Sequence, residues 1–262
     1  MSDRVYPTAL GASSPDRITL LGHDLVDDVM GQVGFGELAF WLATQRRPTA
    51  GETRVFEAVL AALADHGYTP TAIVTRLTHL SAPDSVQGAL AAGLLAGGSR
   101  FLHDQLNEPL PVDDDGWDAL ALRVVTAQRE AKRFVPGLGH HVHKQGDPRT
   151  PKLMELASEE GVTGPHLALF AAIGRVHPQV LGKTLPLNGA GVCGAVLADL
   201  GLPLELLRGF ALLARTAGLI GQLAEELRHP VANEIFLSVD LNNEPVDPDP
   251  YRPPPLDGET HG

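Results

Sequence analysis

Residues 136–149 read Pro136-Gly137-Leu138-Gly139-His140-His141-Val142-His143-Lys144-Gln145-Gly146-Asp147-Pro148-Arg149. Proline and glycine at the start of this stretch disfavour a regular helix. Gly137 and Gly139 let a ligand come close to the main chain, and the planar fork of Arg149 suits a carboxylate or a phosphate. Histidine supplies proton transfer near neutral pH. The stretch therefore predicts a loop that binds and transforms a ligand.

Helical patterns flank this loop on both sides. Apolar residues recur at helical spacing over residues 117–134, and Pro136-Gly137 would end that helix. After the loop, Thr150 and Pro151 are typical of an N-cap and a first helical residue. The loop is thus predicted to connect two helices.

Other segments show the same periodicity. Thr49 and Glu52 have capping-box spacing ahead of a helix that would carry His66 at its C-terminal end. Further helices are predicted at 81–97, 166–176, 191–200 and, along an apolar stripe, 206–227. Strand alternation is scarce, and residues 244–262 are predicted to form an extended tail. The pattern as a whole predicts an all-α fold.

The charge balance excludes some functions. The 262 residues include 20 Lys and Arg against 32 Asp and Glu, a net charge of −12, whereas a nucleic-acid binder needs a basic surface. An anionic ligand would require a local basic pocket, for which Lys144, Arg149 and Arg215 are the candidates.

Cellular location follows from weaker signals. The single cysteine, Cys193, excludes an intrachain disulfide, fits a reducing compartment and is expected to be a small core residue. No apolar run reaches membrane-spanning length, and no signal-peptide core follows Met1. We expect a cytoplasmic protein with no membrane partner.

The pattern Pro-Gly-x-Gly-His, followed by Lys144 and then Asp-Pro-Arg, resembles the central motif of citrate synthases and of the related citryl-CoA lyases, including the lyase module of ATP-citrate lyase. Four other stretches resemble the family in the same order: Leu63-Ala64-Asp65-His66-Gly67, Gly93-Leu94-Leu95-Ala96-Gly97-Gly98-Ser99-Arg100-Phe101, Leu187-Asn188-Gly189-Ala190-Gly191 and Leu213-Ala214-Arg215-Thr216-Ala217-Gly218-Leu219-Ile220-Gly221. The resemblance covers about residues 18–228.

This resemblance implies a citrate synthase-like fold. A large helical domain would comprise residues 1–112 and 187–262, and a smaller helical domain would be inserted at 113–186. It also implies a homodimer with its active sites between the domains.

The resemblance implies a Claisen-type carbon–carbon bond, made in synthases from acetyl-CoA and oxaloacetate and broken in citryl-CoA by lyases. His140 matches the histidine that donates to the ketone or alkoxide, and His66 matches a histidine that also holds the oxaloacetate portion. Arg149 and Arg215 match arginines that bind carboxylates. For coenzyme A, the matching backbone is Gly137, Leu138 and Gly139, with Lys144 as a further contact. No metal is expected.

Each assignment has a purely structural alternative. His140 or His66 would then only cap a helix end, Arg149 would pair with Asp147, and Arg215 would be a buried ion-pair partner. Metal binding by His141 and His143, completed by His103 or Asp147, is a minority alternative.

Two groups of the family are missing. Phe101 stands where citrate synthases have a histidine, as in the lyases, and Ala190 aligns with the aspartate that transfers a proton. Asp199 lies too far along the chain to replace it. The histidines considered as a substitute base are His23, His103, His141 and His143.

The sequence predicts a citryl-CoA lyase-like enzyme that cleaves citryl-CoA to acetyl-CoA and oxaloacetate. Citrate synthase-type condensation is one alternative. The other is a non-catalytic protein that binds an acyl-CoA or a carboxylate, for which Ala190 is the main argument.

Overall fold

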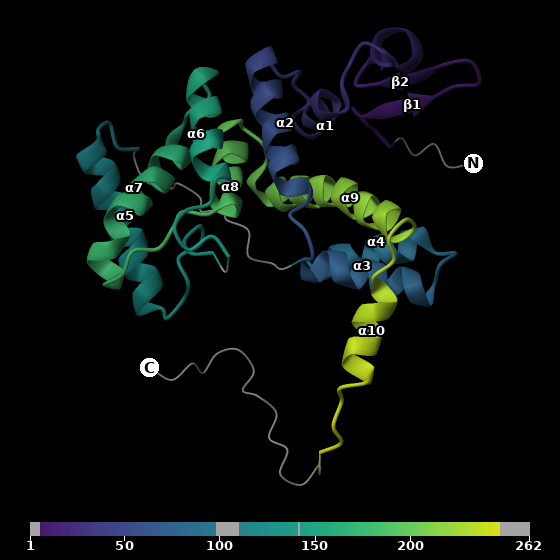
Figure 1. The fold of residues 1–262 in the computed structure, drawn as a ribbon. Helices are drawn as coiled ribbons and strands as arrows, with labels where there is room; N and C mark the ends of the chain where they lie inside the picture. Colours follow the sequence, from purple (N-terminus) through teal and green to yellow (C-terminus); the bar gives the residue numbers. More distant parts are fainter. Residues whose placement is uncertain (1–5, 98–109, 141, 247–262) are drawn as a thin grey trace.

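The computed structural model describes residues 6–97, 110–140 and 142–246, and it confirms the predicted all-α fold (Figure 1). The helices are α1 (Phe35–Thr44), α2 (Ala50–Ala64), α3 (Pro70–Ser81), α4 (Val86–Leu95), α5 (Asp114–Glu130), α6 (Arg149–Glu159), α7 (Pro165–Leu181), α8 (Gly189–Asp199), α9 (Leu207–Glu226) and α10 (Ala232–Asp240). A 3₁₀ turn, Leu204–Leu206, leads into α9. No helix in this described part is long and apolar enough to cross a membrane.

A small antiparallel sheet near the N-terminus was not predicted. Its strands are β1 (Gly11–Ser13), β2 (Ile18–Leu20) and β3 (His23–Asp24), in the order β1-β2-β3. Strands of two or three residues are too short to show an alternating pattern. A π-helical turn, Leu25–Val29, follows, and the Asp24 side chain accepts hydrogen bonds from its first amides.

Helix α2 forms as its sequence predicts. Thr49 Oγ1 accepts a hydrogen bond from the Glu52 amide at 3.2 Å, and Glu52 Oε2 accepts one from the Thr49 amide at 2.7 Å. The capping box therefore stabilises the start of the helix. The helix ends at Ala64, so His66 lies two residues beyond it rather than in its last turn.

The helix predicted over 81–97 begins later than expected. Ser81 ends α3, and α4 starts after Ser85. Pro83 explains the break, because the residue before a proline is pushed out of the helical region. Ala82 has φ −139° and ψ 70°.

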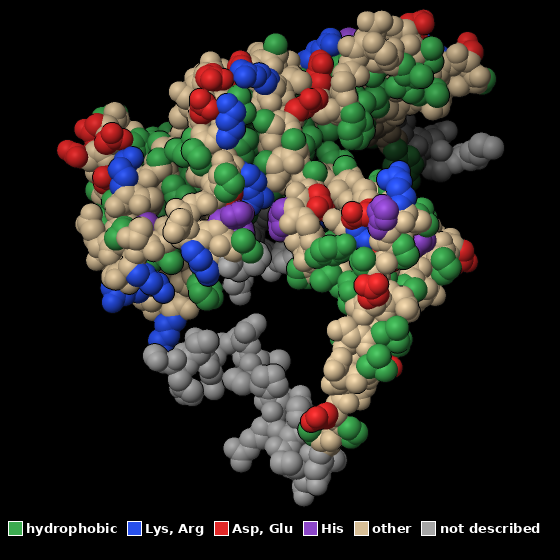
Figure 2. Space-filling view, viewed as in Figure 1, with side chains coloured by type: hydrophobic (Ala, Val, Ile, Leu, Met, Phe, Trp, Pro, Cys, Tyr) green, Lys and Arg blue, Asp and Glu red, His purple; other side chains and the backbone are tan. Residues whose placement is uncertain are grey.

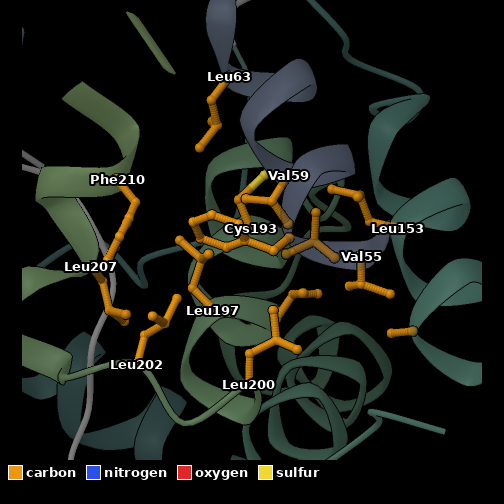
Figure 3. Packing of buried hydrophobic residues seen from close by; sticks show 14 of the residues in the cluster. Val55, Val59, Leu63, Leu153, Cys193, Leu197, Leu200, Leu202, Leu207 and Phe210 are labelled. Atoms are coloured by element: carbon orange, nitrogen blue, oxygen red, sulfur yellow. The ribbon is translucent and has the colours of Figure 1, made fainter. Parts of the chain in front are cut away.

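The main hydrophobic core lies among α1, α2, α6, α8 and α9 (Figure 3). Its centre includes Val59, Cys193 and Leu197, all fully buried. Burial raises the pKa of the Cys193 thiol to about 12, so the side chain is a neutral core residue, as expected.

A second core cluster lies between α5 and α7. Leu120, Val125 and Val176 are buried there. Residues of α6, including Leu153 and Ala157, belong to the first cluster. The division into domains at 1–112, 113–186 and 187–262 stays a prediction, and most of the predicted tail lies outside the described residues.

Helix α9 buries a different face from the predicted stripe. Its buried apolar residues are Leu207, Phe210, Ala214, Leu219 and Leu223. Of the predicted stripe, Leu206, Ala217, Ile220 and Leu227 are exposed. Apolar residues occupy both faces of this helix, so periodicity alone did not identify the buried one.

Glycines allow α9 to cross its neighbours closely. A Cβ atom on Gly218 would lie 1.9 Å from the carbonyl oxygen of Ala64 in α2. On Gly93, a Cβ atom would lie 1.9 Å from Thr75 Oγ1 and 2.8 Å from Leu219 Cδ1. Both are packing glycines, whereas a Cβ on Gly88 would meet only Ser85 of its own helix start.

Gly218→Ala should destabilise the protein by about 1–3 kcal/mol, because the methyl group meets backbone that cannot rotate away. Urea denaturation followed by circular dichroism measures the change in free energy of unfolding. Gly221→Ala is the matched control on the same helix, since nothing lies within 4 Å of its added Cβ. The control should be neutral or stabilising by up to about 1 kcal/mol. Equal effects of the two substitutions would contradict the packing role of Gly218.

Candidate active site

A cavity of about 580 Å³ lies where the end of α2, the start of α3, the loop after α5 and one face of α9 meet. Its lining residues are Leu63, His66, Tyr68, Thr69, Pro70, Thr71, Ala96, Gly97, His140, Val142, His143, Arg149, Arg208, Ala211, Leu212 and Arg215. Figure 2 shows histidine side chains on both sides of a hollow in the middle of the molecule.

The cavity has a charge opposite to that of the whole protein. Three arginines and three histidines line it, and the described lining includes no aspartate or glutamate. The net charge of the chain is −12. The local basic pocket that the sequence required is therefore present, and its chemistry suits an anionic ligand.

Arg149 lies at the start of α6 and is paired with Asp147. Its Nε and Nη2 donate to the two carboxylate oxygens of Asp147 at 2.9 and 2.7 Å, and Nη1 donates to the carbonyl of Ala62 at 3.1 Å. These bonds use one hydrogen on each terminal nitrogen, so each keeps one for a ligand. Arg149 therefore both pairs with Asp147 and lines the cavity.

Arg215 of α9 has an unsatisfied nitrogen. Its Nη1 lies 3.6 Å from Asp65 Oδ2, is buried, and makes no hydrogen bond to the described residues. Burial lowers the pKa of Arg215; the Asp65 carboxylate opposes this shift and the Arg149 cation adds to it. An arginine nevertheless stays charged, so two like charges face one space.

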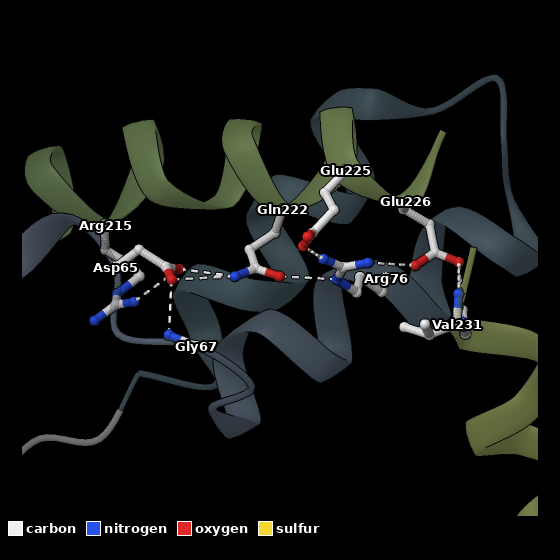
Figure 4. A network of polar contacts seen from close by, with 9 residues as sticks. Asp65, Gly67, Arg76, Arg215, Gln222, Glu225, Glu226 and Val231 are labelled. Atoms are coloured by element: carbon white, nitrogen blue, oxygen red, sulfur yellow. Dashed lines mark hydrogen bonds and ion pairs between the residues drawn. The ribbon is translucent and has the colours of Figure 1, made fainter. Parts of the chain in front are cut away.

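Asp65 links Arg215 to a polar network along α9 that surrounds the buried Arg76 (Figure 4). Gln222 Nε2 donates to both Asp65 oxygens, and Gln222 Oε1 accepts from Arg76 Nε at 2.8 Å. Arg76 is fully buried and also donates to Glu226 at 2.7 Å and to Glu225. Hydrogen bonds of this network hold the Asp65 carboxylate, which lies beside Arg215.

His66 follows α2 and lines the same cavity. His66 is an exposed residue, but partial loss of solvent around its ring in the cavity lowers its pKa, and the charges of Arg215 and Arg149 lower it further. A neutral imidazole between two arginines can donate to or accept from a ligand without adding a third charge.

His140 has a defined tautomer. Its Nδ1 accepts hydrogen bonds from the backbone amides of Val142 at 3.1 Å and His143 at 3.0 Å. An acceptor nitrogen carries no proton, so the hydrogen of this imidazole is on Nε2. The loop thus holds His140 as a neutral hydrogen-bond donor.

The backbone of Gly137, Leu138 and Gly139 is bound to the strand-like segment before α8. The Gly139 amide donates to the Pro186 carbonyl at 2.7 Å, and the Asn188 amide donates to the Gly137 carbonyl at 2.9 Å. These three residues and the exposed Lys144 are not among the described lining residues. Their contact with coenzyme A stays a prediction.

Ala190 lies in the first turn of α8 and is half-buried, outside the described lining of the cavity. Asp199, at the other end of α8, accepts hydrogen bonds from the amides of Gly164, His166 and Leu167. It stabilises the start of α7 and is occupied there.

The histidines considered as a substitute base lie in different places. His23 is in β3, with its ring centroid 5.0 Å from that of Trp41, and does not line the cavity. His143 does line it. Phe101, His103 and His141 lie outside the described residues. Within residues 6–97, 110–140 and 142–246, no group of three His, Cys, Asp or Glu side chains that could hold a metal ion comes together.

Arg208 is a cavity residue that sequence reasoning missed. It lies on the same face of α9 as Arg215, seven residues earlier, and its Nη2 donates to the Gly97 carbonyl at 2.7 Å. The spacing of seven residues places both arginines on one helical face and was a signal available in the sequence.

Comparisons with known proteins agree with this architecture. The family model "Citrate synthase, C-terminal domain" matches residues 23–236. Citrate synthase of Deinococcus radiodurans is 29% identical over 214 residues, which are 78% of this chain and 55% of that protein, so the chain spans about half of its length.

Two solved structures are similar over most of this chain. Citryl-CoA lyase from Hydrogenobacter thermophilus gives a TM-score of 0.75 at 26% identity, over 96% of this chain and 98% of the lyase. A mutant ATP citrate lyase from Methanosaeta concilii, in complex with (3S)-citryl-CoA, gives 0.64 at 19% identity, over 89% of this chain and 42% of that one. The second similarity concerns the fold alone. The predicted citrate synthase-like fold is confirmed.

His66 should titrate below the usual histidine pKa of about 6.5. Arg215→Gln should raise this pKa toward the usual value, because removing a nearby cation favours the protonated imidazole. Histidine ring signals followed by NMR across pH measure it. Arg228→Gln, an exposed arginine outside the cavity, is the control and should change nothing. An unchanged His66 pKa in Arg215→Gln would contradict the proximity of the two groups.

Proposed function

This chain belongs to the citrate synthase family, and we propose that it cleaves citryl-CoA to acetyl-CoA and oxaloacetate in the cavity described above. The observation that carries the proposal is the cavity lining, in which a donor-only histidine and three arginines face one space with no described carboxylate. Oxaloacetate is a dicarboxylate with a ketone, and this lining matches each of those groups.

Each residue has a role in this proposal. Arg149 and Arg215 bind the two free carboxylates through their remaining hydrogens. His140 donates from Nε2 to the oxygen that is a hydroxyl in citryl-CoA and a ketone in oxaloacetate. His66 holds the same portion of the substrate. Coenzyme A extends toward Gly137, Leu138, Gly139 and Lys144.

Cleavage is favoured over condensation by the extent of the similarity. The chain matches the full length of a citryl-CoA lyase, at 98% of that protein, but only 55% of a citrate synthase. Condensation uses the same groups in reverse and remains the alternative among enzymes.

A non-catalytic acyl-CoA-binding protein is the alternative of another class. Ala190 supports it, because a methyl group transfers no proton. The donor tautomer of His140 argues against it, because a hydrogen bond to a ketone oxygen serves the reaction itself.

We also propose a homodimer. The outer face of α9 and helix α10 expose large apolar side chains, including Ile220, Leu227, Phe236, Val239 and Leu241. Apolar residues gathered on adjoining elements are typical of an interface. A second copy would cover them, as the resemblance to the family implied.

Wild-type protein incubated with citryl-CoA should release oxaloacetate, measured by reduction with malate dehydrogenase and NADH. His140→Ala should lower kcat about 10²–10³-fold, because it removes a donor that acts in the transition state. Affinity for coenzyme A, measured by calorimetry, should not change. His229→Ala, an exposed histidine outside the cavity, is the control. Binding of coenzyme A without any turnover by the wild type would favour the non-catalytic alternative.

Sedimentation equilibrium should give twice the 27.8 kDa of one chain at micromolar concentration. Ile220→Asp combined with Leu227→Asp should produce monomers, because it places charges in the proposed apolar interface. Retention of the helical circular dichroism spectrum shows that the variant is folded. A wild type that sediments only as a monomer would disprove the dimer.

A further inference from the structure

The loop that carries His140 also brings a second imidazole into the cavity. The ring centroids of His140 and His143 are 4.6 Å apart, with an angle of 38° between the ring planes. Both side chains are half-buried and line the cavity. The His143 amide is also one of the two donors to His140 Nδ1. The loop backbone therefore holds the His140 ring, and the His143 ring lies beside it.

The two histidines differ in what their nitrogens can do. His140 Nδ1 accepts two amide hydrogens and its Nε2 carries a proton, so in this arrangement His140 donates and does not accept a proton. The ring nitrogens of His143 make no hydrogen bond to the described residues. A neutral imidazole with such a nitrogen is a proton acceptor.

Cleavage of citryl-CoA needs a proton acceptor at the hydroxyl oxygen. The ionisable groups that line the cavity with His143 are His66, Tyr68, His140, Arg149, Arg208 and Arg215. The arginines are permanently charged donors, and Tyr68 offers a phenolic O–H. His66 lies near Arg149 and Arg215 and is already proposed to hold the oxaloacetate portion of the substrate together with them. His143 is therefore the remaining candidate for the base.

We propose that His143 is the catalytic base that replaces the proton-transferring carboxylate missing at Ala190. This inference rests on the proposed cleavage of citryl-CoA. His143 lies against the imidazole that donates to the reacting oxygen, so it can reach the proton on that oxygen.

The proposed step is balanced. His143 takes the hydroxyl proton of citryl-CoA, and the electron pair of that O–H bond forms the ketone of oxaloacetate. The adjacent carbon–carbon bond breaks, and its electron pair forms the enolate of acetyl-CoA. The His143 imidazolium then returns the proton to the enolate carbon, which gives the methyl group of acetyl-CoA and regenerates the base. His140 Nε2 remains a donor to the oxygen throughout, and no further reactant is needed.

His143→Ala and His143→Gln test this role, since both keep the backbone amide that holds His140. Each should lower kcat for citryl-CoA cleavage about 10²–10⁴-fold, the usual contribution of a general base, while the affinity for coenzyme A stays within about twofold. Exchange of acetyl-CoA methyl protons with deuterated solvent, followed by NMR, should fall in parallel. The wild-type kcat should rise with pH along a limb that both variants lose.

Chemical rescue separates a base from a structural residue. Imidazole added to His143→Ala should restore at least a tenth of the lost rate, whereas imidazole cannot repair a misfolded loop. His23→Gln is the control, because it removes a histidine outside the cavity, and it should keep wild-type activity.

The outcomes distinguish the two proposals. A wild type that neither cleaves citryl-CoA nor exchanges acetyl-CoA protons overturns the proposed function and this inference with it. An active wild type with near-normal rates and an unchanged pH profile in both His143 variants overturns only the role of His143. The same holds if His143→Gln is fully active while His143→Ala is inactive and not rescued, because glutamine cannot act as a base at neutral pH.

Discussion

The ion pair between Asp147 and Arg149 holds the cavity together. The buried Asp147 carboxylate accepts from the Gly189 amide at the start of α8 and from both the backbone and the side chain of Arg149. Arg149 in turn donates to Ala62 near the end of α2. Burial opposes the ionisation of Asp147, but these hydrogen bonds hold its pKa below the usual range. One pair therefore joins the histidine loop, α6, α8 and α2, and a Cβ on Gly189 would lie 2.4 Å from Arg149 Nε and break that arrangement.

The different faces of helix α9 carry apolar, basic and hydrogen-bonding side chains. Leu207 and Ala214 enter the main core, Arg208 and Arg215 face the cavity, and Gln222 and Glu226 bind the buried Arg76. From Arg208 to Arg215 the helix rises about 10 Å. Asp65 is where two of these roles meet, because it accepts from Gln222 and lies beside Arg215. The cavity can thus be basic in an acidic protein. The carboxylates nearest Arg149 and Arg215 are those of Asp147 and Asp65, and both accept hydrogen bonds from other residues.

Much of the fold and part of the site follow from the sequence. The capping box at Thr49 follows from local sequence, and the structure confirms it. The order of the family-like motifs predicted that four residues lie together in one site: His66, His140, Arg149 and Arg215. No spacing rule could have done so, because these residues are far apart in the sequence. The buried face of α9 and the partnership of Arg76 with Glu226 were not predictable, because they depend on which helices pack together. Arg208 was missed because the motif does not include it.

In the proposed function, the alanine at position 190 leaves proton transfer to a histidine. A carboxylate among arginines would be held ionised by their charge, but the described lining has none. Loss of solvent and nearby cations both favour a neutral imidazole in this cavity, as the lowered pKa of His66 shows. In the proposed function, a base without charge also leaves Arg149 and Arg215 available to the substrate instead of pairing with them. A histidine in place of a carboxylate therefore suits the proposed function, in which the arginines bind two carboxylates of the ligand.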